Sequence, residues 1–244
     1  MNQKATHQVM AMYGSLFDHY LERGFYRMRR NLFTTEEYFD IEKLCMFDVF
    51  WLRTKIQELP KPNTHKIWKL NKHFEVHIGP AKFNAEIDEL YERYRKHMKF
   101  DAHESIQHFM IGEEKFCDFN SGIIEIRDEQ KLIAAGYFDM GANSIAGNLN
   151  FYDPHYKKYS LGKYLMLRKI DFAQSNQFTY YYTGYLAVDN TKFDYKLFPD
   201  ASAVEVLIKQ ENLTWFPYNN IQKEGLIPFA KWANLHKSYP SINF

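Results

Sequence analysis

Apolar residues recur at helical spacing in two early stretches of the chain. Within residues 9–23 they fall on one face of a helix, and Gly24 follows as a helix end: Val9, Met12, Tyr13, Leu16 and Tyr20. Further along, Pro80 and the candidate cap Asn84 precede a second run with the same spacing: Ile87, Leu90, Tyr91, Tyr94 and Met98. The pattern therefore predicts a helix over 9–23 and another that begins near residue 84.

Short β-rich runs dominate the rest of the chain. They predict strands at 48–56, 74–78, 122–127, 131–140, 144–152, 178–188 and 202–208. Residues 160–174 have helical spacing, and Ser160 is the expected N-cap. Three strands, a helix and then further strands predict an α+β fold, in which helices flank a mixed sheet.

A basic, proline-containing segment interrupts this pattern. Residues 60–73 read PKPNTHKIWKLNKH, which predicts a loop or linker. We place the domain boundary close to it. The interpretation is a smaller N-terminal lobe at 1–79 and a larger domain at 80–244.

Composition limits which partners the protein can bind and in which cellular compartment we expect it. The 244-residue chain has a net charge of +1, so a polyanion must be held by a local patch rather than by a global field. The two cysteines, Cys45 and Cys117, form no CxxC and predict no disulfide framework. No apolar run approaches the ~20 residues that span a membrane, and the N-terminus lacks the apolar core of a signal peptide. We therefore expect a cytoplasmic protein without a membrane partner.

The most informative stretch is FYDPHYKKYSLGKYLMLRK, residues 151–169. A strand leads through a basic turn into a helix N-terminus, where unpaired backbone amides and the helix dipole favour an anion. Gly162 has no side chain to keep a ligand from the backbone. Five cationic side chains lie close by in the sequence: Lys157, Lys158, Lys163, Arg168 and Lys169. The pattern predicts a phosphate site, and a solvated basic face is the alternative.

The order of strands, basic turn, helix and strand resembles the N-acetyltransferase (GNAT) fold, whose turn holds the pyrophosphate of coenzyme A. The motifs resemble the C-terminal domain of the arginyl-tRNA–protein transferase family, which includes a bacterial leucyl-transferring branch. The resemblance rests on FYDP (151–154) followed by SLGKY (160–164), and on YYYTGY (180–185) followed by TKFDYK (191–196). Three other stretches are similar to the family: KLIAAGYFD (131–139), ELYERYRKH (89–97) and LERGFYR (21–27).

The chain departs from this family in three places. The family's N-terminal region carries a CxxC and a Cys-Cys pair that bind a metal or cluster, whereas here Cys45 alone lies near the second pair. One thiol cannot build a four-ligand site, so we expect neither a metal nor another cofactor. The run Ile145-Ala146-Gly147-Asn148 and the tail 209–244 also depart from the family pattern.

The resemblance implies transfer of an arginyl or leucyl group from charged tRNA to the α-amine of proteins that begin with Asp or Glu, which marks them for degradation (the N-end rule). The partners would be aminoacyl-tRNA and such N-termini. Because the ester of charged tRNA is already activated, Ser160 is not needed as a nucleophile. The chemistry requires positioning, proton removal and stabilisation of the oxyanion.

The resemblance also implies roles for individual residues. Asp139 and Glu125 are alternative bases and Tyr182 is a further catalytic candidate, whereas Asp153 is read as a turn residue. The substrate-binding candidates form four groups. They are the turn (Ser160, Leu161, Gly162), nearby cations (Lys157, Lys158, Lys163), base platforms (Tyr152, Tyr164, Tyr180) and cations for an acidic side chain (Lys192, Lys196, Arg27).

Two other functions remain open from the sequence. One is a coenzyme A-dependent N-acetyltransferase on the same fold, although the usual glycine pattern of that turn is not met by KKYSLGKY. The other is a non-catalytic relative that binds tRNA or N-terminal peptides. The basic run 60–73 also has two interpretations: it binds tRNA phosphates, or it is a solvated linker.

Overall fold

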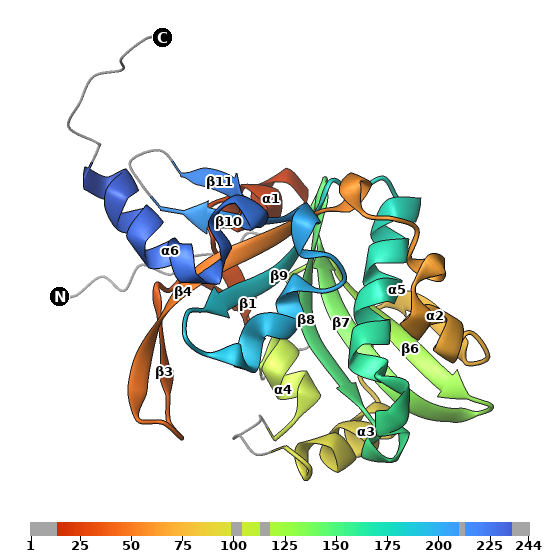
Figure 1. Ribbon diagram of the computed structural model, residues 1–244. Coiled ribbons are helices and arrows are strands. Elements are labelled where there is room, and N and C mark those ends of the chain that lie inside the picture. The colour runs from red at the N-terminus through yellow and green to blue at the C-terminus, as the bar shows by residue number, and fades with distance from the viewer. Residues whose placement is uncertain (1–13, 99–103, 113–117, 210–212, 236–244) are drawn as a thin grey trace, which may run out of the picture.

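A computed structural model describes residues 14–98, 104–112, 118–209 and 213–235. Helices and strands are interspersed along the chain (Figure 1). The helices are α1 (Gly14–Glu22), α2 (Lys66–Asn71), α3 (Ala85–Arg95), α4 (Ile106–Ile111), α5 (Leu161–Ser175) and α6 (Tyr218–Leu235). The strands are β1 (Tyr26–Met28), β2 (Asn31–Phe33), β3 (Glu37–Asp40), β4 (Cys45–Lys55), β5 (Glu75–Pro80), β6 (Ser121–Asp128), β7 (Lys131–Met140), β8 (Ser144–Tyr152), β9 (Tyr180–Ala187), β10 (Val204–Ile208) and β11 (Thr214–Pro217). Five short 3₁₀ segments join them: η1 (Ile56–Glu58), η2 (Pro62–Thr64), η3 (Pro154–Tyr159), η4 (Thr191–Leu197) and η5 (Ala201–Ala203).

One large sheet runs through the described residues, in the order β11-β10-β4-β9-β8-β7-β6-β5, and β3 pairs with β4 at its side. Neighbouring strands are antiparallel except for β8 and β9, which are parallel. The parallel pair is joined by α5, as a crossover connection requires. The expected α+β class, with a mixed sheet between helices, is confirmed, and so is the order of three strands, turn, helix and strand.

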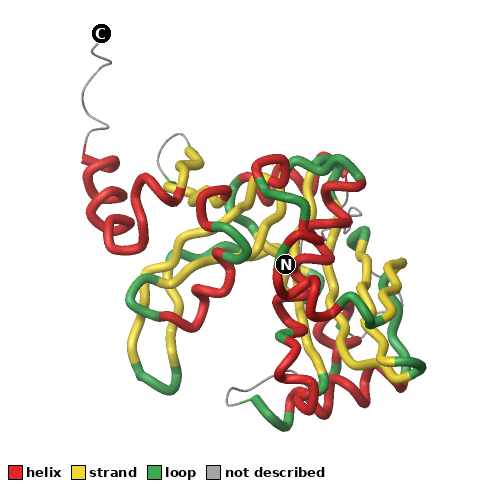
Figure 2. The backbone as a smooth tube through the Cα atoms, turned by 45° about the vertical axis from the view of Figure 1, so that its right-hand side comes forward, coloured by secondary structure: helices red, strands yellow, loops and turns green. Residues whose placement is uncertain are grey.

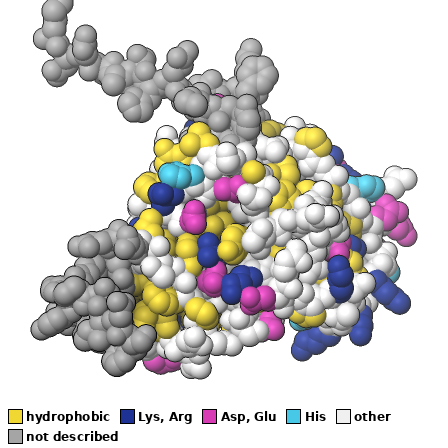
Figure 3. Space-filling view, turned by 90° about the horizontal axis from the view of Figure 1, so that it is seen from above, with side chains coloured by type: hydrophobic (Ala, Val, Ile, Leu, Met, Phe, Trp, Pro, Cys, Tyr) yellow, Lys and Arg dark blue, Asp and Glu magenta, His cyan; other side chains and the backbone are white. Residues whose placement is uncertain are grey.

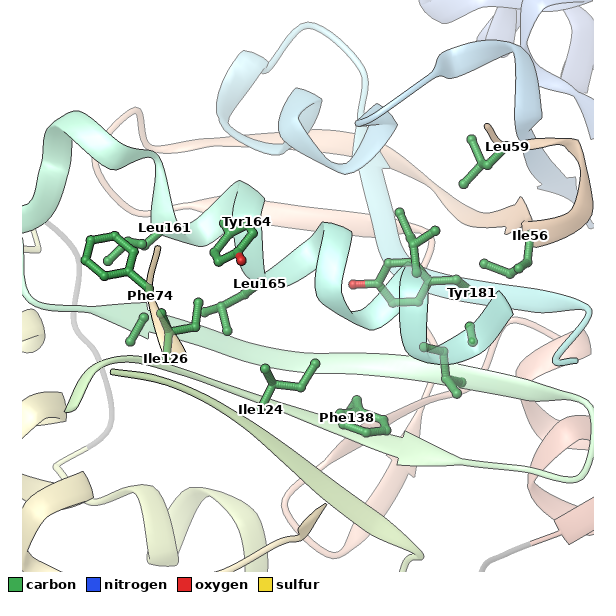
Figure 4. Packing of buried hydrophobic residues seen from close by; sticks show 14 of the residues in the cluster. Ile56, Leu59, Phe74, Ile124, Ile126, Phe138, Leu161, Tyr164, Leu165 and Tyr181 are labelled. Carbon is green, nitrogen blue, oxygen red and sulfur yellow. The ribbon is translucent and has the colours of Figure 1, made fainter. Parts of the chain in front are cut away.

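Helices cover both faces of this sheet (Figures 1 and 2). On one face α5 packs its apolar side on β6, β7 and β8, where Leu161, Leu165 and Ile170 are fully buried with Ile124 and Phe138 (Figure 4). On the other face α3 and α4 bury Leu90, Ile106 and Met110 against β7 and β8. Because both faces of the sheet are covered here, β7 reads as a nearly continuous apolar run rather than as a strict alternation.

The first part of the chain contributes strands to the same sheet. β4 pairs with both β9 and β10, and the β3–β4 hairpin projects from the body (Figure 2). β5, at the other end of the sheet order, pairs with β6. The division into 1–79 and 80–244 stays a prediction, and strands from both sides of it share hydrogen bonds.

Residues 60–73 are not the extended linker that their composition predicts. They contain η2 and α2, and α2 begins after His65, whose ring nitrogen Nδ1 accepts a hydrogen bond from the Ile67 amide at 3.1 Å. Trp68 lies edge-on to Tyr164 of α5, with 5.7 Å between ring centroids, and Asn71 is fully buried. The helix is stabilised by packing against α5, which local composition does not reveal.

The helix predicted over 9–23 is α1 in its described part, and residues 9–13 lie outside the described residues. The strands predicted between residues 48 and 208 all form, with small shifts at their ends. Among the described helices, none is both long enough and apolar enough to cross a lipid bilayer.

Candidate functional site

The site is built around the connection from β8 to α5. β8 ends at Tyr152, the 3₁₀ segment η3 follows, and α5 begins at Leu161. Ser160 joins the two helical segments in a left-handed conformation with φ of 53°. Its side chain makes no capping hydrogen bond, so the expected N-cap role is wrong.

The first turn of α5 presents free backbone donors. The Tyr164 amide bonds to the Ser160 carbonyl at 3.1 Å, whereas the amides of residues 161–163 have no acceptor among the described residues. A Cβ added at Gly162 would meet only the Tyr152 ring, at 3.6 Å, so neighbouring side chains do not fill the space before this residue. Free amides, the positive end of a 15-residue helix and an open glycine are features that favour an anion, and we call this first turn the anion site.

Asp153 fixes the start of this connection. Its buried carboxylate accepts hydrogen bonds from the His155 amide at 3.1 Å and the His155 ring at 2.8 Å, and it pairs with Lys131 at 2.9 Å. Burial alone would raise the pKa of Asp153, but hydrogen bonds from Lys131 and His155 outweigh it and lower the pKa to about 2. The carboxylate is thus a permanent anchor of the turn, in agreement with its prediction as a turn residue.

β8 and β9 separate beside the turn (Figure 1). They pair only over Ser144–Ala146 and Tyr180–Tyr182, and no pairing is recorded beyond these residues. At the point of separation, the Tyr26 hydroxyl donates to the Gly147 carbonyl, and a Cβ at Gly147 would lie 2.7 Å from the Tyr181 hydroxyl. Two tyrosine rings therefore pack against the glycine where the strands begin to diverge.

Aromatic rings and two lysines gather at the β9 side of this separation. Tyr38 of β3, Tyr185 of β9 and Phe193 of η4 contact one another, with ring centroids 5.1 to 6.4 Å apart. The Lys196 ammonium lies over the rings of Tyr185 (4.5 Å) and Phe193 (4.8 Å), and Lys192 donates to the Tyr38 hydroxyl at 3.1 Å. We call these five residues the aromatic–lysine cluster.

Lys196 is held in this cluster without a carboxylate partner among the described residues. Its Nζ donates to the Tyr185 carbonyl at 3.0 Å. A Cβ added at Gly184 would come within 2.8 Å of this Nζ, so the lysine packs closely against the glycine. Gly184 has φ of +98°, a conformation that glycine adopts readily. Burial lowers the pKa of Lys196 to about 7. A cation that is partly desolvated and lacks an anion is suited to receive one.

Two of the candidate site residues, Asp139 and Arg27, pair with each other inside the protein. The Arg27 guanidinium lies 2.7 Å from Asp139 Oδ1, and their side chains are 3% and 0% exposed. Ser121 donates to the same oxygen and Asn148 to the other, at 2.8 Å. Both carboxylate oxygens are therefore occupied. This environment opposes the predicted roles of Asp139 as a base and of Arg27 as a receptor for an acidic substrate.

Glu125 and Tyr182 are also buried, at 4% exposure each. Glu125 lies on β6 and pairs with Lys82 at 2.6 Å, and its strand neighbours Ile123 and Arg127 face α3 rather than α5. Tyr182 packs edge-on to Trp215, and burial raises its pKa to about 12. Neither side chain lies beside the turn, so the geometry gives no support to their predicted catalytic roles.

The predicted substrate-binding residues differ in how much of each side chain is exposed to solvent. Leu161 and Tyr164 are fully buried, and the Tyr164 hydroxyl accepts from Arg168, so the Tyr164 ring cannot serve as a platform for a base. Tyr152 is half-buried beside Gly162, and Tyr180 is half-buried with Arg53 3.9 Å from its ring centroid. Tyr181 faces the core under α5 while Tyr180 and Tyr182 share the opposite side, which is the alternation expected of a strand. The cations Lys157, Lys158, Lys163 and Lys192 are exposed.

Tyr195 was not a candidate from the sequence, and Lys169 was counted there among the cations beside the turn. Tyr195 is 51% exposed, and the burial of part of its ring raises the pKa of its hydroxyl. Lys169 is 1% exposed and bonds to the Tyr137 carbonyl and Asn150. Asn150 in turn donates to the Gly162 carbonyl at 3.4 Å. Lys169 therefore supports the turn from inside the protein. Its place in the basic run suggested a surface cation, which it is not.

Comparison with known proteins identifies part of the chain. Residues 86–201 match the family model described as arginine-tRNA-protein transferase, C terminus. This segment, just under half of the chain, is similar to the C-terminal part of the arginine-tRNA–protein transferase family. The matched segment contains the turn, α5, β9 and η4, and therefore both the anion site and the lysines of the aromatic–lysine cluster.

Individual relatives are distant. Arginyl-tRNA–protein transferase 2 of Arabidopsis thaliana is 30% identical over 56% of this chain and 27% of its own length. Aspartate/glutamate leucyltransferase of Hahella chejuensis is 27% identical over 66% of each chain. The chain thus spans less than two thirds of these relatives. Among solved structures, the ribosomal-protein-S18-alanine N-acetyltransferase of Escherichia coli is 15% identical, with a TM-score of 0.31, over 42% of this chain and 61% of that one.

Proposed function

We propose that this chain is an aminoacyl-tRNA–protein transferase, which moves an aminoacyl group from charged tRNA to the α-amine of a protein N-terminus. The observation that carries the proposal is the open anion site at the first turn of α5, beside the separation of β8 and β9 and within the family-matched residues. In the proposal, the amides of residues 161–163 bind the terminal phosphates of the tRNA. The half-buried Tyr152 ring offers a face to an unstacked base.

The reaction needs little from the protein beyond placement. The amine nitrogen attacks the ester carbonyl, a C–N bond forms and the ester C–O bond breaks. The ribose hydroxyl leaves with a proton, while the proton of the original ammonium goes to solvent or a base. An α-amine has a pKa of about 7.7 to 8.0, so a reactive fraction is already neutral at pH 7. The burial and pairing of Asp139 and Glu125 are compatible with this, because positioning alone accounts for much of such a rate enhancement.

The aromatic–lysine cluster is proposed as the receptor for an acidic N-terminal side chain. Lys196 is desolvated and has no carboxylate partner among the described residues, and the Lys192 ammonium also lies near the Phe193 ring, 6.0 Å from its centroid. A carboxylate that enters here would gain charge-assisted hydrogen bonds. Acceptors that begin with Asp or Glu, and a role in marking proteins for degradation in the cytoplasm, belong to this proposal.

Direct transfer tests the function. The protein is incubated with labelled arginyl- or leucyl-tRNA and a peptide that begins with Glu, and an N-acetylated copy of the peptide serves as the control. We expect label in the free peptide only. If neither tRNA labels it while acetyl-CoA acetylates it, the chain is a coenzyme A-dependent acetyltransferase. Binding of both substrates without transfer would identify a non-catalytic relative.

The ratio of kcat/KM for acceptors that begin with Glu and with Gln should fall as the pH rises through about 7. Lys196 holds a carboxylate only when it is protonated, and burial has lowered its pKa to about 7, so its charge is lost across this range. Titration of the acceptor α-amine affects both peptides and cancels in the ratio. A Lys196→Arg variant should keep the preference to higher pH, because arginine stays charged. A ratio that is independent of pH in the wild type would exclude Lys196 as the receptor.

A further inference from the structure

The structure places two basic segments, far apart in the sequence, on one surface. Residues 56–73 run antiparallel to α5 along its whole length. Gln174 near the helix end donates to the carbonyls of Ile56 and Leu59, at 3.2 and 3.1 Å. At the other end Asn71 donates to the Tyr159 carbonyl at 2.9 Å. The basic run 60–73 and the basic turn therefore form a continuous surface.

The middle of this surface is held by stacked side chains. The Arg168 guanidinium lies 3.6 Å from the centroid of the Trp68 ring, and it also donates to the Tyr164 hydroxyl at 2.7 Å. Its nearest carboxylate, Asp171, is 3.9 Å away. Arg168 is thus fixed between α2 and α5. The two helices present their exposed lysines from one packed unit.

We define the α2–α5 basic face by its exposed lysines: Lys66, Lys69, Lys72, Lys157, Lys158 and Lys163. None of the six has a carboxylate within ion-pair distance among the described residues. Among the other described lysines, Lys55, Lys82, Lys131 and Lys223 pair with acids, whereas Lys43 and Lys196 form no such pair among the described residues. The segments 59–74 and 154–170 contain no Asp or Glu at all. The cationic side chains that gather at one edge in Figure 3 lie on the side of the molecule where Figure 1 shows α2 and α5.

Lysines without acidic partners that extend along a whole helix are suited to bind a polyanion with regularly spaced charges. α5 has 15 residues and is therefore about 22 Å long. A nucleic acid duplex presents on the order of ten phosphates over that distance, whereas the anion site at Gly162 is a single helix turn. Lysine contacts to phosphate carry no sequence information, so this surface would fix the orientation of a duplex.

We propose that the α2–α5 basic face binds the phosphates of the double-stranded acceptor arm of tRNA, behind the 3′ end that enters the turn. This inference rests on the proposed function and extends it to α2. The helix lies outside the family-matched residues 86–201, so the match does not assign it a role. The basic run 60–73 is then part of the RNA interface rather than a solvated linker.

The test compares two variants of equal charge. Lys69→Gln/Lys72→Gln removes two charges from the α2–α5 basic face, and Lys43→Gln/Lys231→Gln removes two exposed charges elsewhere. Binding to a deacylated tRNA and to an RNA hairpin that copies its acceptor arm is measured across a salt series. We expect the first variant to bind about three- to tenfold more weakly, with a salt slope shallower by about two, and the control to be unchanged. Equal binding by the two variants would overturn the inference.

Transfer separates this inference from the function itself. The substrates are full aminoacyl-tRNA and a short aminoacylated oligonucleotide that ends in the same unpaired nucleotides. The Lys69→Gln/Lys72→Gln variant should lose transfer from the tRNA several-fold and keep wild-type transfer from the oligonucleotide. If the wild type transfers from neither, the proposed function fails, and the binding series alone decides whether this surface holds an RNA duplex. Equal losses with both substrates would contradict a role in duplex binding.

Discussion

Asp139→Asn is expected to destabilise the protein by about 3 to 5 kcal/mol, because it removes the carboxylate that pairs with the buried Arg27 guanidinium. The two side chains are almost completely excluded from water, and Asp139 also accepts from Ser121 and Asn148, so several hydrogen bonds weaken together. In a protein of this size the change corresponds to a fall in Tm of roughly 10 °C or more. Thermal and urea unfolding of the variant and the wild type measure it.

A double variant separates this structural role from a catalytic one. Arg27→Met/Asp139→Asn removes both charges, so it should recover a large part of the stability lost in the single variant. If Asp139 were instead the general base, Asp139→Asn would unfold like the wild type and lose transfer, and the double variant would recover nothing. That outcome would restore the role that the sequence predicted for Asp139 and would contradict the assignment made from the buried pair.

The pair also shows what sequence reasoning cannot reach. Arg27 and Asp139 are separated by 112 positions, and nothing in the local pattern around either residue shows that they meet. Asp139 was a catalytic candidate because the implied reaction calls for a base and Asp139 is an acidic residue in one of the family-like stretches. In the structure this carboxylate belongs to a buried ion pair that joins β1 to β7.

The central strands could be predicted because their signal is local. β6, β7 and β8 follow one another through short turns, and the apolar runs that cover both faces are contained within each strand. The insertion of β4 between β9 and β10 could not be predicted, because it depends on pairing between segments more than 100 residues apart. The helix α2 was missed for a related reason. Its six residues include two lysines and become helical through packing of Trp68 on α5.

The candidate site was predicted in part. The basic turn and its open glycine came from the spacing of SLGKY after FYDP, since helix N-termini bind anions through backbone groups that any sequence supplies. The sequence does not show which groups surround each side chain or how deeply it is buried. Spacing alone did not distinguish Lys169, buried under the turn, from Lys163 on its surface, or Lys196 in its aromatic surroundings from any exposed lysine.

Gly162→Glu is expected to reduce tRNA binding and transfer at least about a hundredfold while the protein stays folded. A carboxylate at this position would occupy the anion site and repel phosphate, and each lost charge-assisted hydrogen bond costs about 1.5 to 3 kcal/mol. The fold should tolerate the change. A side chain at Gly162 meets only the Tyr152 ring, at 3.6 Å, and an acidic residue in the first turn of a helix is stabilising by about 0.3 to 1 kcal/mol. We therefore expect an unchanged or higher Tm together with a large loss of function, measured by unfolding, by tRNA binding and by the transfer assay.

Two controls at the same position separate charge from size. Gly162→Gln has nearly the bulk of glutamate without its charge, and Gly162→Ala adds only a methyl group in a helix, where alanine is favoured. The loss should be largest for glutamate, smaller for glutamine and slight for alanine, and it should be accompanied by a shallower salt dependence of binding in the glutamate variant. Equal losses for glutamate and glutamine would mean that the turn is a steric contact and not a phosphate site. Transfer by Gly162→Glu at the wild-type rate would show that the tRNA end lies elsewhere, because no phosphate could share the first turn of α5 with a carboxylate.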